Sequence, residues 1–562
     1  MRDWDERISY TLKSLPNPEK RLFFRITQII AETNGISLTD TLDLLAYQVQ
    51  QTQDQALFDI IVDFQKKLAD FNEDCIDIQR LLSHSVSKAL YEFFKCFPLR
   101  YHEEHIHLTG SLNAQFIYPR LNQLLSGPKS QLYLNKLYQI YGNKGTQISS
   151  VEDVDKLIRL KDGEGFAQYL KILYLPKIIL VDGNAHFESA YHLAHELYHQ
   201  FNIGSVRLKF SISRATSMAE EEIPGADTIQ VEDVIMGLYQ GFRAFQKNHP
   251  DFHFVLSPSF RKEASFFDAS RFKNRQEHFE HLINQIVRLL DRYPDLIGVM
   301  TDVDTVGNEE ELYRKGHFAE FRRGFRKLQY RGFRIRSHHG ETFKTLKKGI
   351  QAVDNAMNIW HIDTLEHGLS LGINPNYYFH RMYQRVIELN SRGIPIDPSH
   401  PDYRELVELD WASCATFVLD KLLGGVPLTK EDTLLFLKAK FHTAREVEHY
   451  QHDVLNRMIQ KGVGLVTLPS SNKKLTGHLD DYKDHPFSWW EKKGVQLSLG
   501  TDNYITLNTD YIREMLILLY SDPRDLKITK LLMVTTHENR RPYLSHLLWK
   551  MHKKLGELES QL

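Results

Sequence analysis

The segment HEEHIHLTG, residues 102–110, is the most informative stretch of this chain because it places two histidines one residue apart. Side chains of a β-strand alternate between its two faces, so His105 and His107 would point to the same side. Two imidazole nitrogens at the end of one strand can bind a single divalent metal ion. The segment therefore predicts a strand that ends in half of a metal site.

Three later segments carry residues of the same chemistry: SHHGE (337–341), LEHG (365–368) and LGTDN (499–503). Neutral imidazoles and a carboxylate suit zinc, and a catalytic zinc site keeps one position open for water. The four segments together supply a ligand set and two groups that could move protons. The ligand candidates are His105, His107, Asp502 and one of the neighbours His338 and His339; the proton carriers are Glu341 and His367.

Short apolar segments alternate with helix-like stretches from residue 103 onward. Eight of them can be counted, and this alternation predicts an α/β fold, a (β/α)8 TIM barrel. The candidate metal ligands and proton carriers follow the first, fifth, sixth and eighth segments. This places them at the carboxyl ends of strands, where such barrels have their active sites. The predicted strands are 103–108, 206–213, 252–257, 296–301, 332–336, 362–366, 463–468 and 495–499.

Two domains are predicted from the distribution of these segments. Residues 1–100 show apolar residues at helical spacing and no chemical motif, which indicates a helical N-terminal region. Residues 101–562 would form the barrel. The intervals between strands one and two and between strands six and seven are too long for plain βα units, so insertions are expected at about 113–200 and, as a helical insertion, at about 376–460.

The four segments resemble the metal-dependent adenosine/AMP deaminase family over residues 103–112, 206–375 and 463–510. DTVGNE (304–309) and LPSSN (468–472) resemble further segments of that family. The resemblance implies a hydrolase that deaminates 6-aminopurines to 6-oxopurines with release of ammonia. It implies one Zn²⁺ per chain. It also implies that His338, and not His339, is the metal ligand, because the family's ligand stands three residues before the catalytic glutamate. The implied roles are metal ligands His105, His107, His338 and Asp502, proton donor Glu341, water-orienting base His367 and purine contact Gly307.

Two departures from the family pattern bear on the substrate. Thr109 stands where nucleoside deaminases have an aspartate that binds the ribose 5′ hydroxyl. The negative charge of that aspartate would repel a 5′ phosphate, and Thr109 carries no such charge. Asn503 replaces a second aspartate, and its amide could donate to a purine ring nitrogen. Arg214, and Arg261 with Lys262, follow the second and third strands and could bind phosphate, or could be ordinary surface cations. A nucleoside and a 5′-phosphorylated nucleotide both remain open as substrates.

A competing motif is HELYH, residues 195–199, which matches the HExxH pattern of zinc metalloproteases. On a helix, His195 and His199 would share one face and Glu196 would act as the base. Glu220, Glu221 and Glu222 are the nearest candidates for a third ligand. A third possibility is a scaffold without catalytic activity.

The composition of the chain argues against several other classes of protein. The 562 residues include 70 basic and 72 acidic side chains, so no global basic field indicates nucleic-acid binding. No apolar run reaches about 20 residues, the length that spans a membrane. The charged first residues are unlike a signal peptide, and the three cysteines form no CxxC pair. We expect a cytoplasmic protein with a small purine as its partner, and with the helical additions available for homo-oligomer contacts.

Overall fold

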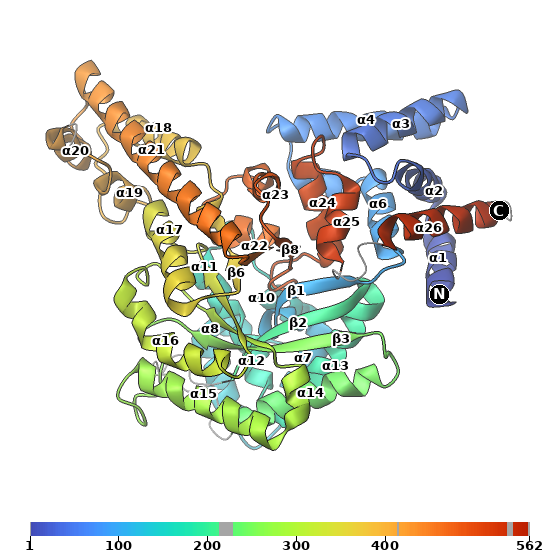
Figure 1. The fold of residues 1–562 in the computed structure, drawn as a ribbon, viewed down its shortest axis with the longest axis horizontal. Helices are drawn as coiled ribbons and strands as arrows, with labels where there is room; N and C mark the ends of the chain where they lie inside the picture. Colours follow the sequence, from blue (N-terminus) through green and yellow to red (C-terminus); the bar gives the residue numbers. More distant parts are fainter. Residues whose placement is uncertain (1, 213–228, 413–414, 537–542, 560–562) are drawn as a thin grey trace.

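The computed structural model describes residues 2–212, 229–412, 415–536 and 543–559. Eight parallel strands follow one another around a single sheet in the order β1 to β8 (Figure 1). The predicted (β/α)8 barrel is confirmed. The strands are β1 (Tyr101–His107), β2 (Ile203–Ser211), β3 (His253–Arg261), β4 (Asp302–Val306), β5 (Arg334–His339), β6 (Thr364–His367), β7 (Gly464–Thr467) and β8 (Leu497–Leu499).

The barrel closes where the chain beyond β8 meets β1. Asp502 and Ile106 form a parallel bridge. The Asp502 amide donates to the His105 carbonyl, and the His107 amide donates to the Asp502 carbonyl, both at 2.9 Å. Backbone hydrogen bonds thus place the aspartate of the fourth segment directly beside the two histidines of the first.

The fourth predicted strand, 296–301, is wrong. Residues Pro294–Gly298 form a 3-10 helix, and β4 begins at Asp302. The apolar pattern failed because Asp302 and Asp304 point into the barrel and pair there with Arg207 and Lys209. A strand whose buried face is charged gives no hydrophobic signal.

Helices surround the barrel and fill both long intervals. The first interval contains α7 (Ala114–Leu125), α8 (Ser130–Tyr141), α9 (Asn143–Thr146), α10 (Val151–Ile158), α11 (Phe166–Ile172), α12 (Tyr174–Ile179) and α13 (Gly183–Gln200). The next four are α14 (Val231–Gln246), α15 (Arg275–Arg292), α16 (Lys315–Gln329) and α17 (Leu346–Asn355). The second interval contains α18 (Pro375–Ser391), α19 (Tyr403–Val407), α20 (Thr416–Leu423) and α21 (Lys430–Gln460), which project away from the barrel in Figure 1.

The N-terminal and C-terminal helices pack on each other beside the barrel (Figure 1). The Tyr520 hydroxyl donates to Ser87 Oγ at 2.6 Å, and the Thr39 amide donates to the Pro523 carbonyl at 2.9 Å. The N-terminal helices are α1 (Arg2–Ser14), α2 (Asn17–Glu32), α3 (Leu38–Gln51), α4 (Gln55–Asn72), α5 (Ile78–Leu82) and α6 (Ser85–Lys95). The C-terminal helices are α24 (Tyr511–Ser521), α25 (Ile528–Thr535) and α26 (Leu544–Glu559), whereas α22 (Pro469–Leu475) and α23 (Phe487–Lys492) lie between β7 and β8.

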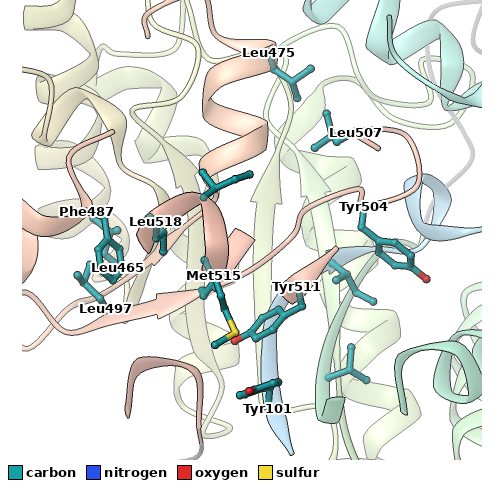
Figure 2. Packing of buried hydrophobic residues seen from close by; sticks show 14 of the residues in the cluster. Tyr101, Leu465, Leu475, Phe487, Leu497, Tyr504, Leu507, Tyr511, Met515 and Leu518 are labelled. Carbon is teal, nitrogen blue, oxygen red and sulfur yellow. The ribbon is translucent and has the colours of Figure 1, made fainter. Parts of the chain in front are cut away.

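Helix α24 packs on β1, the strand that carries His105 and His107. Figure 2 shows Tyr101 of β1 beside Tyr511 and Met515, and all three side chains are buried. The two tyrosine rings lie 5.7 Å apart, and the Tyr511 hydroxyl donates to the His102 carbonyl at 2.9 Å. This packing holds β1 in place below its functional end.

Within the described part of the chain, we find no helix with the combined length and hydrophobicity that crossing a bilayer requires.

Candidate metal and active site

Three histidines from two strands converge at the carboxyl end of the barrel. His105 Nε2 lies 3.1 Å from His107 Nε2, which lies 3.2 Å from His338 Nε2. Tetrahedral coordination with Zn–N bonds of about 2.05 Å would separate two nitrogens by about 3.3 Å. The imidazoles of β1 and β5 are therefore spaced as ligands of one small cation.

Two buried carboxylates orient two of these rings. His105 Nδ1 donates to Glu366 Oε2 at 2.7 Å, and His338 Nδ1 donates to Asp304 Oδ2 at 3.0 Å. Each of these histidines therefore turns the lone pair of Nε2 towards the centre of the cluster. Burial, followed by the positive charge of Lys209, lowers the pKa of His105 and of His338 well below the usual value, so both rings are neutral.

Asp502 completes the cluster with a carboxylate. Its Oδ1 lies 3.5 Å from His107 Nε2 and 3.8 Å from His105 Nε2. Ser471 Oγ donates to Oδ2, and Asn503 Nδ2 donates to Oδ1, both at 2.6 Å. Asp502 has φ +63°, a left-handed conformation that is uncommon for a residue with a side chain, and the closure of the barrel holds it there.

The donor set fits a divalent metal ion. Facing lone pairs of neutral nitrogens at 3.1–3.2 Å repel one another unless a cation lies between them. Among the described residues, two groups of three or more potential ligands were found, and both belong to this cluster: His105 with His107 and His338, and His105 with His367 and Asp502. The structure brings together all four ligands that the sequence predicted.

Glu341, just beyond β5, and His367, the last residue of β6, face the same space. His367 Nε2 has no hydrogen-bond partner among the described residues and lies 3.8 Å from Glu341 Oε2. His367 Nδ1 donates to Asn472 Oδ1 at 2.9 Å, which leaves Nε2 as an acceptor. Burial raises the pKa of Glu341 to about 7 and lowers the pKa of His367. A carboxylic acid and a neutral imidazole thus stand side by side.

Lys209 of β2 joins the two carboxylates that orient the rings of His105 and His338. Its fully buried Nζ donates to Asp304 Oδ2 at 2.7 Å and to Glu366 Oε1 at 2.8 Å. Burial by itself would raise the pKa of Glu366, but Arg336 and Lys209 outweigh burial and hold this pKa below its usual value. Lys209 therefore holds both orienting groups in place through hydrogen bonds.

A cavity opens above the cluster and contains further predicted residues. Thr109, Gly307 and Asn503 line it together with Glu341 and His367. The amide of Asn503 donates to Asp502 and to the Tyr169 hydroxyl, so its nitrogen is already used, and Oδ1 is buried without a partner among the described residues. The structure thus leaves an acceptor at this position, whereas the sequence suggested a donor.

The roof of the cavity comes from the first insertion and was missed by sequence reasoning. Phe166, Tyr169 and Leu170 of α11, with Leu173 after it, line the cavity. The signal that could have found them is the spacing i, i+3, i+4, i+7, which puts four apolar side chains on one face of a helix. Phe210 and Phe266 extend this apolar wall. The enclosed, largely apolar space suits a flat heteroaromatic ring.

The predicted phosphate-binding cations have different positions. Lys262 is buried, donates to the His338 carbonyl and lies 4.0 Å from Glu309, so it supports the metal ligand and does not line the cavity. Arg261 lines the cavity, but its guanidinium forms an ion pair with Glu263 at 2.6 Å. Arg214 lies outside the described residues. Lys177 of α12 is a lining cation that the sequence did not indicate.

Among the described residues, the HExxH motif belongs to no group of three potential metal ligands. His195 and His199 are exposed on α13, whereas Glu196 is buried and points elsewhere. Glu196 accepts hydrogen bonds from the Tyr504 hydroxyl at 2.5 Å and from Asn113 Nδ2 at 3.0 Å. The candidate third ligands, Glu220 to Glu222, lie outside the described residues. The motif serves as a packing helix before β2, and the protease interpretation is not favoured.

No protein-family model matches the chain, and no curated protein matches it in sequence. Solved structures do match. An adenine deaminase from Arthrobacter aurescens is 12% identical, with 81% of this chain and 99% of that chain covered and a TM-score of 0.46. A zinc-bound amidohydrolase from Burkholderia ambifaria is 11% identical, with coverages of 85% and 95% and a TM-score of 0.48. The N6-methyl-AMP deaminase from Arabidopsis thaliana is 13% identical, with coverages of 80% and 96% and a TM-score of 0.45.

Proposed function

We propose that this protein is a metal-dependent hydrolase that removes the 6-amino group of a purine nucleoside or nucleotide and releases ammonia. One observation carries the proposal: an acid of raised pKa and a neutral imidazole, Glu341 and His367, line the same enclosed cavity as a cluster of imidazoles and a carboxylate spaced for one cation. Hydrolysis at an sp² carbon needs these three parts: a nucleophile source, a base and an acid.

His105, His107, His338 and Asp502 would hold the ion, and neutral imidazoles with one carboxylate favour zinc. A bound zinc lowers the pKa of water towards about 7 and so supplies a nucleophile at neutral pH. His367 Nε2 accepts the proton that water loses, because Asn472 fixes the tautomer through Nδ1. Glu341, protonated through burial, donates its proton to a ring nitrogen and so activates the carbon that bears the amino group.

We further propose that the substrate carries a 5′ phosphate. Thr109 places no charge where a carboxylate would repel phosphate, and Lys177 and Arg261 line the same cavity. The ammonium of Lys177 suits phosphate oxygens, and Arg261 can add only the guanidinium donors that its ion pair with Glu263 leaves available. Lys262 is not part of this proposal because its ammonium is used at the His338 carbonyl.

A deaminase assay that measures ammonia release tests both statements. The zinc-loaded protein is offered adenine, adenosine, AMP, dAMP and ATP, which all carry a free 6-amino group, at equal concentrations. We expect turnover of AMP or dAMP at a kcat/KM at least about tenfold above that of adenosine, a difference of about 1.4 kcal/mol. A preference for the free nucleoside refutes the phosphate statement alone. No ammonia from any of these purines, by a protein shown to hold one zinc ion per chain, refutes the proposed activity.

A further inference from the structure

Helix α16 concentrates positive charge on the outside of the barrel. The segment 314–334 contains eight basic residues and one acidic residue, although the whole chain has a net charge of −2. Lys315, Arg322 and Arg326 are spaced i, i+7 and i+11, so they form one row along the helix. Arg323 and Lys327 stand in the adjacent row. We call these five residues the α16 basic face; four are exposed and Arg326 is half-buried.

The charges of this face are largely uncompensated. Among the described residues, no carboxylate lies within ion-pair distance of Lys315, Arg322 or Arg323. Lys327 donates to the neutral Asn284, and Arg326 donates to Gln329 and to the Ile359 carbonyl. Glu320, the one acidic residue of the segment, is held by Arg275 at 2.6 Å. Acidic neighbours that would cancel the charge of an ordinary solvated helix are therefore missing along most of this face.

The surface beside the basic face is hollowed. Arg322, Arg323 and Arg326 form one side of a shallow pocket, and Asn358, Ile359 and His361 form the other. The guanidinium groups of Arg322 and Arg323 suit the oxygens of a phosphate group, to which each can donate two parallel hydrogen bonds, and Arg326 adds positive charge to the same concavity. Tyr330, just beyond the helix, is 90% exposed and offers an aromatic ring next to these cations.

We propose that the α16 basic face binds the phosphate backbone of a nucleic acid. The row from Lys315 to Arg326 is about 17 Å long, which matches about five phosphates along one strand of a duplex. An anionic membrane fits this face less well, because a helix that binds a bilayer inserts its apolar side. The apolar side of α16, with Phe318, Phe321 and Phe325, is buried against the barrel and α15. The site is separate from the metal cluster and does not depend on its activity.

Binding of this kind depends on salt in a measurable way. Neutralising about four phosphates gives a slope of about −3.6 in a plot of log K against log salt concentration. Affinity for a labelled 20-base-pair duplex should therefore fall roughly 100-fold between 50 and 200 mM salt. Sequence preference should be weak, because contacts to phosphates carry no base information.

The experiment measures fluorescence anisotropy of duplex RNA and duplex DNA with the full chain and with the double variant Arg322→Glu/Arg323→Glu. Both residues are exposed, so the variant should unfold at the same temperature as the parent protein. We expect its affinity to be at least about tenfold lower, with a slope closer to zero by about 2. The matched control is Lys66→Glu/Arg80→Glu, which reverses two exposed cations on α4 and α5, far from α16 (Figure 1), and should bind like the parent.

Several outcomes overturn the proposal. One is no saturable binding of either duplex at 50 mM salt; another is equal loss of affinity in the control variant. Two further probes distinguish nucleic acid from other polyanions as the ligand of the α16 basic face. If phosphatidylserine vesicles or polyglutamate bind the parent protein and lose binding in Arg322→Glu/Arg323→Glu while the duplexes do not bind, the face serves a membrane or an acidic protein and the nucleic-acid assignment is wrong.

Discussion

Two histidine pairs of the chain have the spacing of metal ligands, and their environments differ. His105 and His107 are enclosed at the end of β1, where a third imidazole and a carboxylate meet them. His195 and His199 match a metal-binding motif equally well, yet both are exposed on α13. Glu366 orients His105 from behind, whereas Glu196 of the second pair is tied to Tyr504 and Asn113. Spacing brings two nitrogens together, but the orienting carboxylates and the other ligands decide whether they form a site.

The largest expected effect is on the first pair. His107→Ala should remove bound zinc and lower kcat by at least about 10³-fold, because an activated nucleophile is lost with the ion. Zinc content by plasma mass spectrometry and ammonia release measure both effects. The matched double variant His195→Ala/His199→Ala should keep one zinc ion per chain and its activity. Loss of zinc in the double variant and not in His107→Ala would reverse the comparison and restore the protease interpretation.

The next effect separates proton transfer from metal binding. Glu341→Gln should retain zinc and lose about 10²–10⁴-fold in kcat, since an amide cannot donate a carboxyl proton. With the pKa of Glu341 raised to about 7, its acid form predominates below that pH and is lost above it. The rate of the parent protein should therefore fall with rising pH above about 7, whereas the residual rate of the variant should lack this limb. A parent profile that stays flat from pH 6 to 9 would contradict the assignment.

A smaller effect tests what supports the first pair. Lys209→Met removes the cation that joins Asp304 and Glu366 and should weaken zinc affinity about 10–100-fold. It should also lower the free energy of unfolding by about 3–5 kcal/mol, because buried carboxylates lose a partner. Chelator competition measures zinc affinity independently of activity. Lys209→Arg keeps the charge and should recover part of the affinity; equal zinc affinity in all three proteins would remove this role.

The smallest effect is on the second motif. Glu196→Gln should leave activity within about twofold and change stability by about 1 kcal/mol, the scale of one hydrogen bond. Burial raises the pKa of Glu196, so its folded state favours the neutral form. Its contribution to stability is thus complete below about pH 4.5 and is lost as pH rises through the raised pKa. Chemical denaturation across this range should show a weaker pH dependence in the variant. Abolished zinc binding would contradict the structural role.

The barrel and the candidate ligand residues could be predicted from the sequence because their signals are local. A strand-like segment that ends in candidate metal ligands can be recognised within ten positions, as at 102–110. The interior of the barrel could not be read in this way. Asp304 and Lys209 are charged, yet both are fully buried because they pair with each other from different strands. The charged residues of β4 therefore remove the hydrophobic pattern by which a strand is recognised. The position of Tyr169 in the roof was equally hidden, since it depends on how an insertion folds back over the barrel.

By itself, the sequence determined the order of the strands, the residues at their carboxyl ends and the chemistry that these residues can perform. Only the tertiary structure decided which histidine pair converges with further ligands, which cations are used within the fold and which remain on the surface. The reason is physical. The properties of a side chain are covalent and local, whereas its pKa, its tautomer and its partners depend on groups that the closed barrel brings within a few ångströms from distant parts of the chain.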